Sequence, residues 1–190
     1  MKFQFHITIN DLVETNKNSF LILCKKNNVK PVLISLDKGK YIRQPMFTKV
    51  VENESFEQAF EEIEKVCKIF KENNFKILRI KSEVPPENSE NFKEKNSKFY
   101  FEWHCKVSFE KKNLIEKLCY ENNAHISKNS LEDEECTRFV TIREYNDKTI
   151  FYSNTKKLSD LFIENGIKII KQKFEYCIYD NKIELDSGWA

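Results

Sequence analysis

The stretch LCKKNN at residues 23–28 decides the predicted fold, because it returns as LCYENN at residues 118–123. Four of the six positions are identical between the two stretches, which lie 95 residues apart. Self-similarity at a fixed spacing is the sequence signature of a structural unit that occurs more than once in a chain. The sequence on either side of the two stretches should therefore match as well.

The match does extend in both directions, and its spacing changes by a few residues only where loops are expected. The matching positions keep the same order along both halves of the chain, so chance is a poor explanation. The further pairs are His6 with His104, Thr48 with Thr141, residues 35–37 with residues 130–132, and residues 79–84 with residues 171–176.

Both halves also have the same predicted order of elements: strand, helix, two strands, helix, strand. Apolar residues at helical spacing predict a helix at residues 55–73, with Ser55 as its N-cap and Gln58 completing a capping box. The predicted strands are residues 2–10, 32–36, 46–51, 75–84, 99–109, 125–130, 138–145 and 167–180, and the other predicted helices are residues 18–27, 111–122 and 155–165.

This order predicts an α+β protein built as a tandem duplication of a ferredoxin-like βαββαβ unit, with antiparallel sheets that carry helices on one face. We expect the first unit at residues 1–84, a linker at residues 85–98, the second unit at residues 99–180 and a C-terminal tail at residues 181–190. The packing of the two sheets is open at this stage, since they could face each other or join into one larger sheet.

Composition places the chain among proteins with a folded core. Hydrophobic residues make up 40% of the 190 residues, and Gly and Pro number only 3 and 4, which argues against a disordered or collagen-like chain. The charged residues nearly cancel to a net charge of +2, so a broad non-specific nucleic-acid surface is not expected. A local basic patch stays open.

The sequence predicts a cytoplasmic protein without a cofactor or a metal. It has no signal segment and no apolar run of about 18 residues, so neither secretion nor a membrane span is expected. The six cysteines are interpreted as reduced packing residues, with three disulfides as the weaker alternative. No spacing of Cys and His matches a recognisable set of metal ligands.

Strand alternation predicts two rows of polar side chains on the helix-free sheet faces, because successive residues of a strand point to opposite faces. In a ferredoxin-like sheet the last strand lies beside the first, so each row draws on both strands. The first row holds Gln4, His6, Thr8, Arg79, Lys81 and Glu83, and the second holds Glu102, His104, Lys106, Lys171, Lys173 and Glu175.

We expect these rows to form a ligand site in which His6 and His104 act as catalytic acid–base groups or bind an anion. Basic side chains would neutralise the ligand, and Glu83 and Glu175 would orient the histidines or lysines. Such a set of groups suits a phosphate-bearing or carboxylate ligand. The predicted ligand-binding residues are Thr8, Arg79, Lys81, Glu83, Lys106, His125, Arg138, Arg143, Lys171, Lys173 and Glu175.

A structural explanation of the same rows stands beside the functional one. Alternating Lys and Glu on a strand usually form a solvated face with weak ion pairs. A histidine in a strand is more often a hydrogen-bonded structural group than a catalyst.

The HIT at residues 6–8 and the HIS at residues 125–127 resemble the H-hydrophobic-[ST] motif of the 2H phosphoesterases. That resemblance implies two histidines acting on cyclic phosphates or RNA ends. The sequence departs from the pattern, because the repeat pairs His6 with His104, and the HCK at residues 104–106 lacks the Ser or Thr.

Seven stretches over most of the chain carry a second resemblance: FHITI, LDKGKYIRQPMFT, RIKSEVPPEN, YFEWHCKV, NAHISKN, RFVTIRE and YDNKIELDSGWA. They are similar to an uncharacterised family of small duplicated ferredoxin-like proteins. The resemblance implies that fold and no activity.

The functional prediction is a protein that binds a phosphate-containing small molecule or a nucleic-acid end at the two polar rows. Whether the protein also catalyses a reaction of that ligand is left open by the sequence. The alternative is a non-catalytic interaction module that contacts a protein partner through its helix-free sheet faces. Enzyme and binding protein both remain open here, as do the ligand and the oligomeric state.

Overall fold

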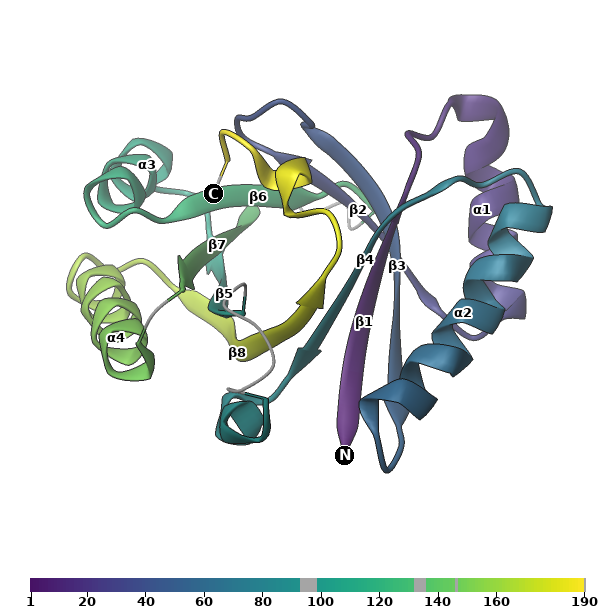
Figure 1. Cartoon of the computed structure of the whole chain (residues 1–190). Helices are drawn as coiled ribbons and strands as arrows, with labels where there is room; N and C mark the ends of the chain where they lie inside the picture. Colours follow the sequence, from purple (N-terminus) through teal and green to yellow (C-terminus); the bar gives the residue numbers. More distant parts are fainter. Residues whose placement is uncertain (93–98, 132–135, 146, 190) are drawn as a thin grey trace.

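Eight antiparallel strands form one closed β-barrel in the computed structural model, which describes residues 1–92, 99–131, 136–145 and 147–189 (Figure 1). The strands are β1 (Lys2–Ile9), β2 (Lys30–Leu36), β3 (Arg43–Glu52), β4 (Ile77–Val84), β5 (Tyr100–Ser108), β6 (His125–Asn129), β7 (Thr137–Glu144) and β8 (Ile169–Asp180). Around the barrel they follow the order β1, β3, β2, β6, β7, β5, β8, β4.

The closed barrel overturns the predicted fold. Residues 2–84 and 100–180 each run through strand, helix, strand, strand, helix, strand, but their sheets are not separate. The strand β2 pairs with β6, and β4 pairs with β8. An open four-stranded sheet would leave unpaired N–H and C=O groups along both edge strands, and closure pairs them. The prediction of two duplicated ferredoxin-like units with open sheets is therefore wrong.

Four helices cover the outside of the barrel as two pairs on opposite sides (Figure 1). One pair is α1 (Glu14–Lys26) and α2 (Phe56–Glu72), and the other is α3 (Lys112–Glu121) and α4 (Lys148–Glu164). Apolar side chains on the strands, among them Phe5, Phe47 and Trp103, are fully buried in the hydrophobic core. The core thus lies between the strands and the helices, and the helix-free faces point inward.

Each helix is followed by a residue in the left-handed backbone region. The φ angles are 51° at Asn28, 65° at Asn74, 51° at Asn123 and 63° at Gly166. Asn and Gly are the residues that adopt this conformation most readily after a helix, so local sequence stops all four helices.

Side-chain caps set two of the helix starts. Ser55 accepts a hydrogen bond from the backbone N–H of Gln58 at the start of α2. The helix expected at residues 155–165 begins earlier, at Lys148, because the Asp147 carboxylate accepts hydrogen bonds from N–H groups in the first turn of α4.

The C-terminal segment, residues 181–189, covers one end of the barrel, which we call the closed end. The last residues of β1, β2, β7 and β8 lie at this end of the barrel, together with the first residues of β3, β4, β5 and β6. The 3-10 helix η2 (Ile183–Asp186) lies there, and Trp189 donates its Nε1–H to the Ile126 carbonyl at 3.0 Å. Figure 1 shows this segment in yellow between β8 and β6.

The structure tests some of the remaining expectations, namely those on membrane helices, disulfides and the linker. No helix in the described ranges has the length and apolar composition that a membrane crossing requires. All six cysteines lie in those ranges as free thiols, so the disulfide alternative does not apply. The unit boundaries and the cytoplasmic location stay predictions. Part of the predicted linker forms the 3-10 helix η1 (Pro86–Asn91), whereas residues 93–98 and 190 lie outside the described residues.

Substitutions at two neighbouring residues of α4 test whether the hydrophobic core lies between this helix and the strands. Phe162 is fully buried and Ile163 is 64% exposed. We expect Phe162→Ala to lower the free energy of unfolding by about 3–5 kcal/mol, because it leaves a cavity under the helix. Ile163→Ala should change it by no more than about 0.5 kcal/mol. Urea denaturation measures both, and equal losses would contradict this placement of the core.

Candidate functional site

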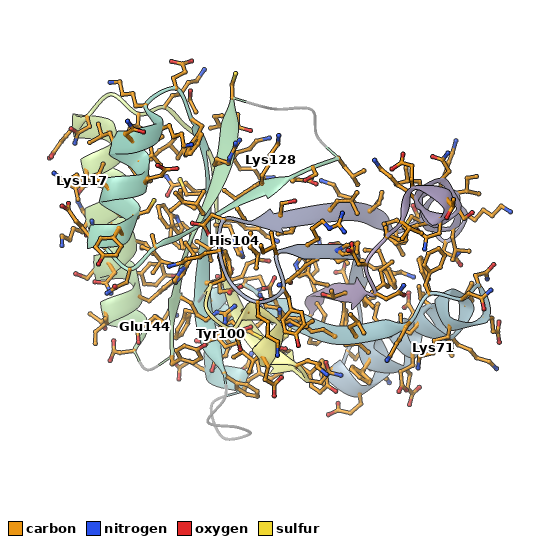
Figure 2. All side chains as sticks on the ribbon, turned by 90° about the horizontal axis from the view of Figure 1, so that it is seen from above. Lys71, Tyr100, His104, Lys117, Lys128 and Glu144 are labelled. Carbon is orange, nitrogen blue, oxygen red and sulfur yellow. The ribbon has the colours of Figure 1, made fainter. Side chains whose placement is uncertain are left out.

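The space inside the barrel, which we call the lumen, is a cavity of about 620 Å³. All eight strands contribute polar side chains to its lining, because alternate residues of each strand point inward. A cavity of this size suits a small molecule. In Figure 2 the labelled His104 lies among the strands, whereas Lys117 lies on the outside with α3.

Charged side chains fasten the C-terminal segment onto the closed end. The Asp186 carboxylate accepts hydrogen bonds from Arg79 Nη1 at 3.0 Å and from Arg143 Nη2 at 2.6 Å. Asp180, at the end of β8, also binds the Arg79 guanidinium. The side chains of these four residues are almost completely buried, so the two arginines hold the C-terminal segment in place as well as lining the lumen.

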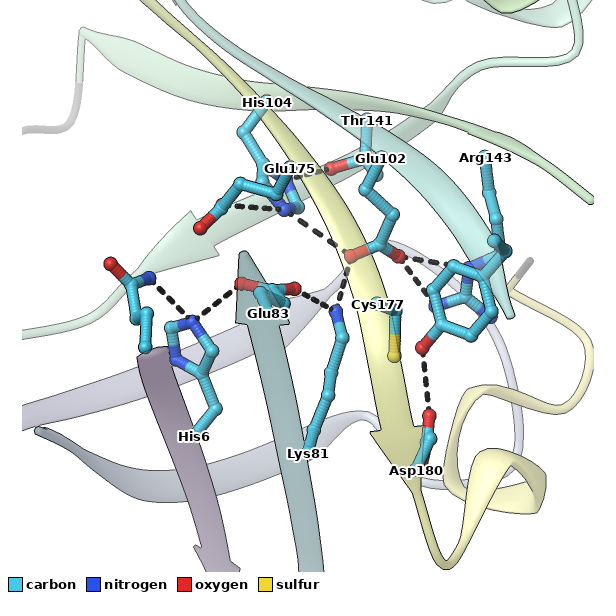
Figure 3. A network of polar contacts seen from close by, with 12 residues as sticks. His6, Lys81, Glu83, Glu102, His104, Thr141, Arg143, Glu175, Cys177 and Asp180 are labelled. Atoms are coloured by element: carbon cyan, nitrogen blue, oxygen red, sulfur yellow. Dashed lines mark hydrogen bonds and ion pairs between the residues drawn. The ribbon is translucent and has the colours of Figure 1, made fainter. Parts of the chain in front are cut away.

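His6 lies in the middle of the lumen between a hydroxyl and a carboxylate. The strand register sets Thr48 on one side of it and Lys81 on the other. Its Nδ1 is 2.9 Å from Thr48 Oγ1. Its Nε2 is 3.0 Å from Glu83 Oε2 (Figure 3). Because an ionised carboxylate only accepts hydrogen bonds, the Nε2–H of His6 donates to Glu83.

His104 has a matching environment in the other half. Its strand neighbours are Thr141 and Lys173. Its Nδ1 is 2.9 Å from Thr141 Oγ1, and its Nε2 is 3.4 Å from Glu102 Oε2 and 3.7 Å from Glu175 Oε2. The side chains of His6 and His104 are 23% and 29% exposed, so both imidazoles reach the space in the lumen.

Lysine ammonium groups hold the three central carboxylates, Glu83, Glu102 and Glu175. Figure 3 shows Lys81 in contact with the first two. Lys81 Nζ is 2.5 Å from Glu83 Oε1 and also binds Glu102. Lys173 Nζ is 2.5 Å from Glu175 Oε1. A buried carboxylate needs such partners, since its charge is costly to remove from water.

The three carboxylates nevertheless differ in their affinity for a proton. Burial and the charge of Glu83 raise the pKa of Glu175 to about 8. Burial also acts on Glu83 and Glu102, but Lys81 beside both of them holds each pKa well below its usual range. Glu175 is therefore the first of the three carboxylates to take up a proton as the pH falls.

The two histidines differ in the same way. Burial lowers the pKa of His6, and the neighbouring Glu83 only partly opposes this. Burial acts on His104 as well, but its hydrogen bond to Glu102 and the charges of Glu102 and Glu175 prevail and raise its pKa. At a given pH His6 is thus more often neutral and able to take up a proton, and His104 is more often protonated and able to give one up.

Two groups of lumen side chains have donor atoms within 4.8 Å of one another, the spacing that a metal ion needs: His6 with Glu83 and Glu175, and Glu83 with Glu102 and His104. Every carboxylate in these groups already binds a lysine ammonium. A divalent cation would have to displace or approach those ammonium groups, which is unfavourable. We therefore identify none of these residues as metal ligands.

The barrel brings most of the predicted site residues into the lumen, and their roles stay predictions. Arg138 is an exception, because its guanidinium stacks 4.5 Å from the ring of Phe109 and does not line the cavity. His125 lies at the closed end, where its ring is 5.3 Å from that of Trp189. The predicted residues that line the lumen are His6, Thr8, Arg79, Lys81, Glu83, His104, Lys106, Arg143, Lys171, Lys173 and Glu175.

The positions of the histidines also bear on the 2H phosphoesterase resemblance. Its second motif would use His125, but His104 is the histidine that shares the carboxylate cluster with His6. Nothing in the comparisons supports that resemblance.

Sequence reasoning missed several residues of the site. Strand alternation placed Glu102 on the row of His104, but no role in ligand binding was assigned to it. Asp186 and Trp189 belong to the tail, for which the sequence carried no sign of an inward position. Lys30 faces the lumen opposite Thr48, a pairing that only the barrel register reveals.

Comparisons with known proteins add little to this geometry. No family model and no curated protein matches the sequence. Among solved structures, the chain is similar to the acetolactate synthase small subunit from Thermotoga maritima, with 10% identity and a TM-score of 0.35, over 95% of this chain and 96% of that chain. A likeness of this degree carries no argument about function.

The raised pKa of Glu175 predicts a pH dependence of stability. The folded state holds this proton up to about pH 8, whereas the unfolded chain loses it near 4.5, so the folded state binds more protons in between. The stabilisation from Glu175 is complete below 4.5 and is lost as the pH rises through 8. Glu175→Gln, which stays neutral, should therefore gain stability relative to the wild type as the pH rises.

Chemical denaturation of both proteins at several pH values measures this difference. Glu83, His104 and Lys173 face Glu175 and remain in both proteins. Because Glu175 also acts on the pKa of His104, the same comparison is repeated in a His104→Ala background, where that coupling is absent. A difference that does not change between about pH 5 and about pH 9 would contradict a raised pKa.

The ion pairs at the closed end predict a second effect on stability. We expect Asp186→Asn to lower the free energy of unfolding by about 3 kcal/mol, because it leaves the buried Arg79 and Arg143 each short of a partner. Glu184→Gln removes the same charge from an exposed position two residues away and should change little. Similar losses in the two variants, measured by urea denaturation, would show that the segment is not fastened by these pairs.

Proposed function

We propose that the lumen binds a small phosphate-bearing molecule and that His6 and His104 transfer protons during a reaction of its phosphate ester. The observation that carries the proposal is the position of both imidazoles, with opposite pKa shifts, in one cavity of about 620 Å³.

The charge of the lumen supports an anionic ligand. Among the described residues that line it, seven are Lys or Arg and four are Glu or Asp. Lys30, Lys106 and Lys171 lie near the end opposite the closed end, which we call the mouth. A cavity with low-dielectric walls and an excess of one charge raises the local concentration of the opposite ion.

The neighbours of the histidines support proton transfer. A threonine hydroxyl donates or accepts, so Thr48 and Thr141 can serve an imidazole that carries its proton on either nitrogen. In a hydrolysis, His6 would take a proton at Nδ1, its unprotonated nitrogen, from the attacking water as the new P–O bond forms, with the Thr48 hydroxyl relaying that proton. His104 Nε2–H would give its proton to the ester oxygen as the old P–O bond breaks. Groups whose environments push their pKa values apart suit such paired roles.

The alternative of an interaction module is less well supported by this geometry. It requires helix-free sheet faces that a folded partner can contact. In the barrel those faces surround the lumen, which a small molecule can enter and a folded domain cannot.

Thermal unfolding tests the binding step. The purified protein is heated with inorganic phosphate, nucleoside monophosphates, cyclic nucleotides and short RNAs. A ligand at a hundred times its dissociation constant adds about 2.7 kcal/mol of stability. For a chain of this size the unfolding midpoint should rise by roughly 5–10 °C.

Two variants locate the ligand. The double variant His6→Ala/His104→Ala should lose the shift, whereas Lys117→Met, which removes a charge on the outer face of α3, should keep it. A compound that gives a shift is then incubated with the protein, and release of phosphate is assayed. The phosphate proposal fails if no compound shifts the midpoint, and also if the double variant keeps the shift.

A further inference from the structure

The lumen has two unlike walls. His6, His104 and the three carboxylates belong to β1, β4, β5 and β8, which are neighbours in the barrel. On the other side of the barrel lie β3, β2, β6 and β7, and three of these strands, β2, β3 and β7, contribute apolar side chains to the same cavity: Val32, Ile34, Leu36, Met46 and Phe139. We call these five residues the apolar wall.

The apolar wall is not part of the hydrophobic core. The core lies outside the barrel under the helices, and none of the five residues belongs to it. Val32, Ile34, Met46 and Phe139 are only half-buried, so they present apolar surface to the lumen. Apolar surface that faces a polar cavity is unfavourable in water, and a ligand that covers it gains that free energy on binding.

The junction of β2 with β6 lies across the barrel from the junction of β4 with β8, because each side of the barrel between the two junctions consists of four strands. A molecule in the lumen therefore contacts the apolar wall with one side and the histidines and carboxylates with the other. Inorganic phosphate alone would leave the apolar wall uncovered.

Phe139 and Lys106 are cross-strand partners at the boundary between the two walls. The ammonium of Lys106 lies 5.7 Å from the centre of the Phe139 ring. If an aromatic ring of a ligand stacks on Phe139, a group attached to that ring therefore lies close to the Lys106 ammonium, near the mouth.

On the basis of the function proposed above, we infer that the ligand is an aryl phosphate: a phosphate monoester whose organic group is a flat apolar ring. The ring packs against Phe139, Met46 and Val32, and the phosphate faces the histidines and lysines of the other wall.

Isothermal titration calorimetry with inorganic phosphate, phenyl phosphate and phenol tests this inference. Phenyl phosphate should bind roughly ten- to a hundredfold more tightly than inorganic phosphate, because its ring leaves water on binding. Phe139→Ala should remove most of that gain and reduce the affinity for inorganic phosphate much less than the affinity for phenyl phosphate. Phe139→Leu keeps most of the volume, so it serves as a second variant if the alanine variant does not fold.

The outcomes separate this inference from the function it rests on. Equal affinities for phosphate and phenyl phosphate would overturn the aryl ligand and leave phosphate binding intact. A preference for phenyl phosphate that persists in both Phe139 variants would also overturn it. Binding of phenol without either phosphate, or binding of none of the three, would overturn the phosphate site and the inference together.

Discussion

The pairing of β2 with β6 and of β4 with β8 is the constraint on which the rest of the structure depends. It joins two four-stranded sheets at both edges, and this turns their helix-free faces inward. Polar rows that would be solvated on open sheets become the lining of one cavity. His6 and His104, 98 residues apart in sequence, come to share a carboxylate cluster for this reason.

The charged side chains that line the lumen have two different roles. At the closed end Arg79 and Arg143 pair with Asp180 and Asp186, and these ion pairs hold the C-terminal segment in place. Toward the middle, Glu175 has the highest proton affinity of the three carboxylates. The charged side chains at the closed end thus stabilise the structure, whereas Glu175 in the middle of the lumen can gain or lose a proton near physiological pH.

The sequence predicted the local features well and the long-range ones poorly. Alternation places Gln4, His6 and Thr8 on one face of their strand, and all three line the lumen. Barrel closure has no comparable signature, because backbone hydrogen bonds join β2 to β6 whatever their side chains are. Val32 and Ile34 show the same limit, since an apolar residue in a strand is ordinarily a core residue, and only the register reveals that these two face a cavity.

The asparagines that follow α1, α2 and α3 have a practical consequence for protein engineering. Asn28, Asn74 and Asn123 hold a left-handed backbone conformation that glycine adopts with less strain, by about 1 kcal/mol per residue. None of the three lines the lumen. The fold therefore contains three independent sites at which stability can be raised without touching the cavity. A triple glycine background would give lumen variants with buried-charge defects a better chance of folding well enough to be assayed.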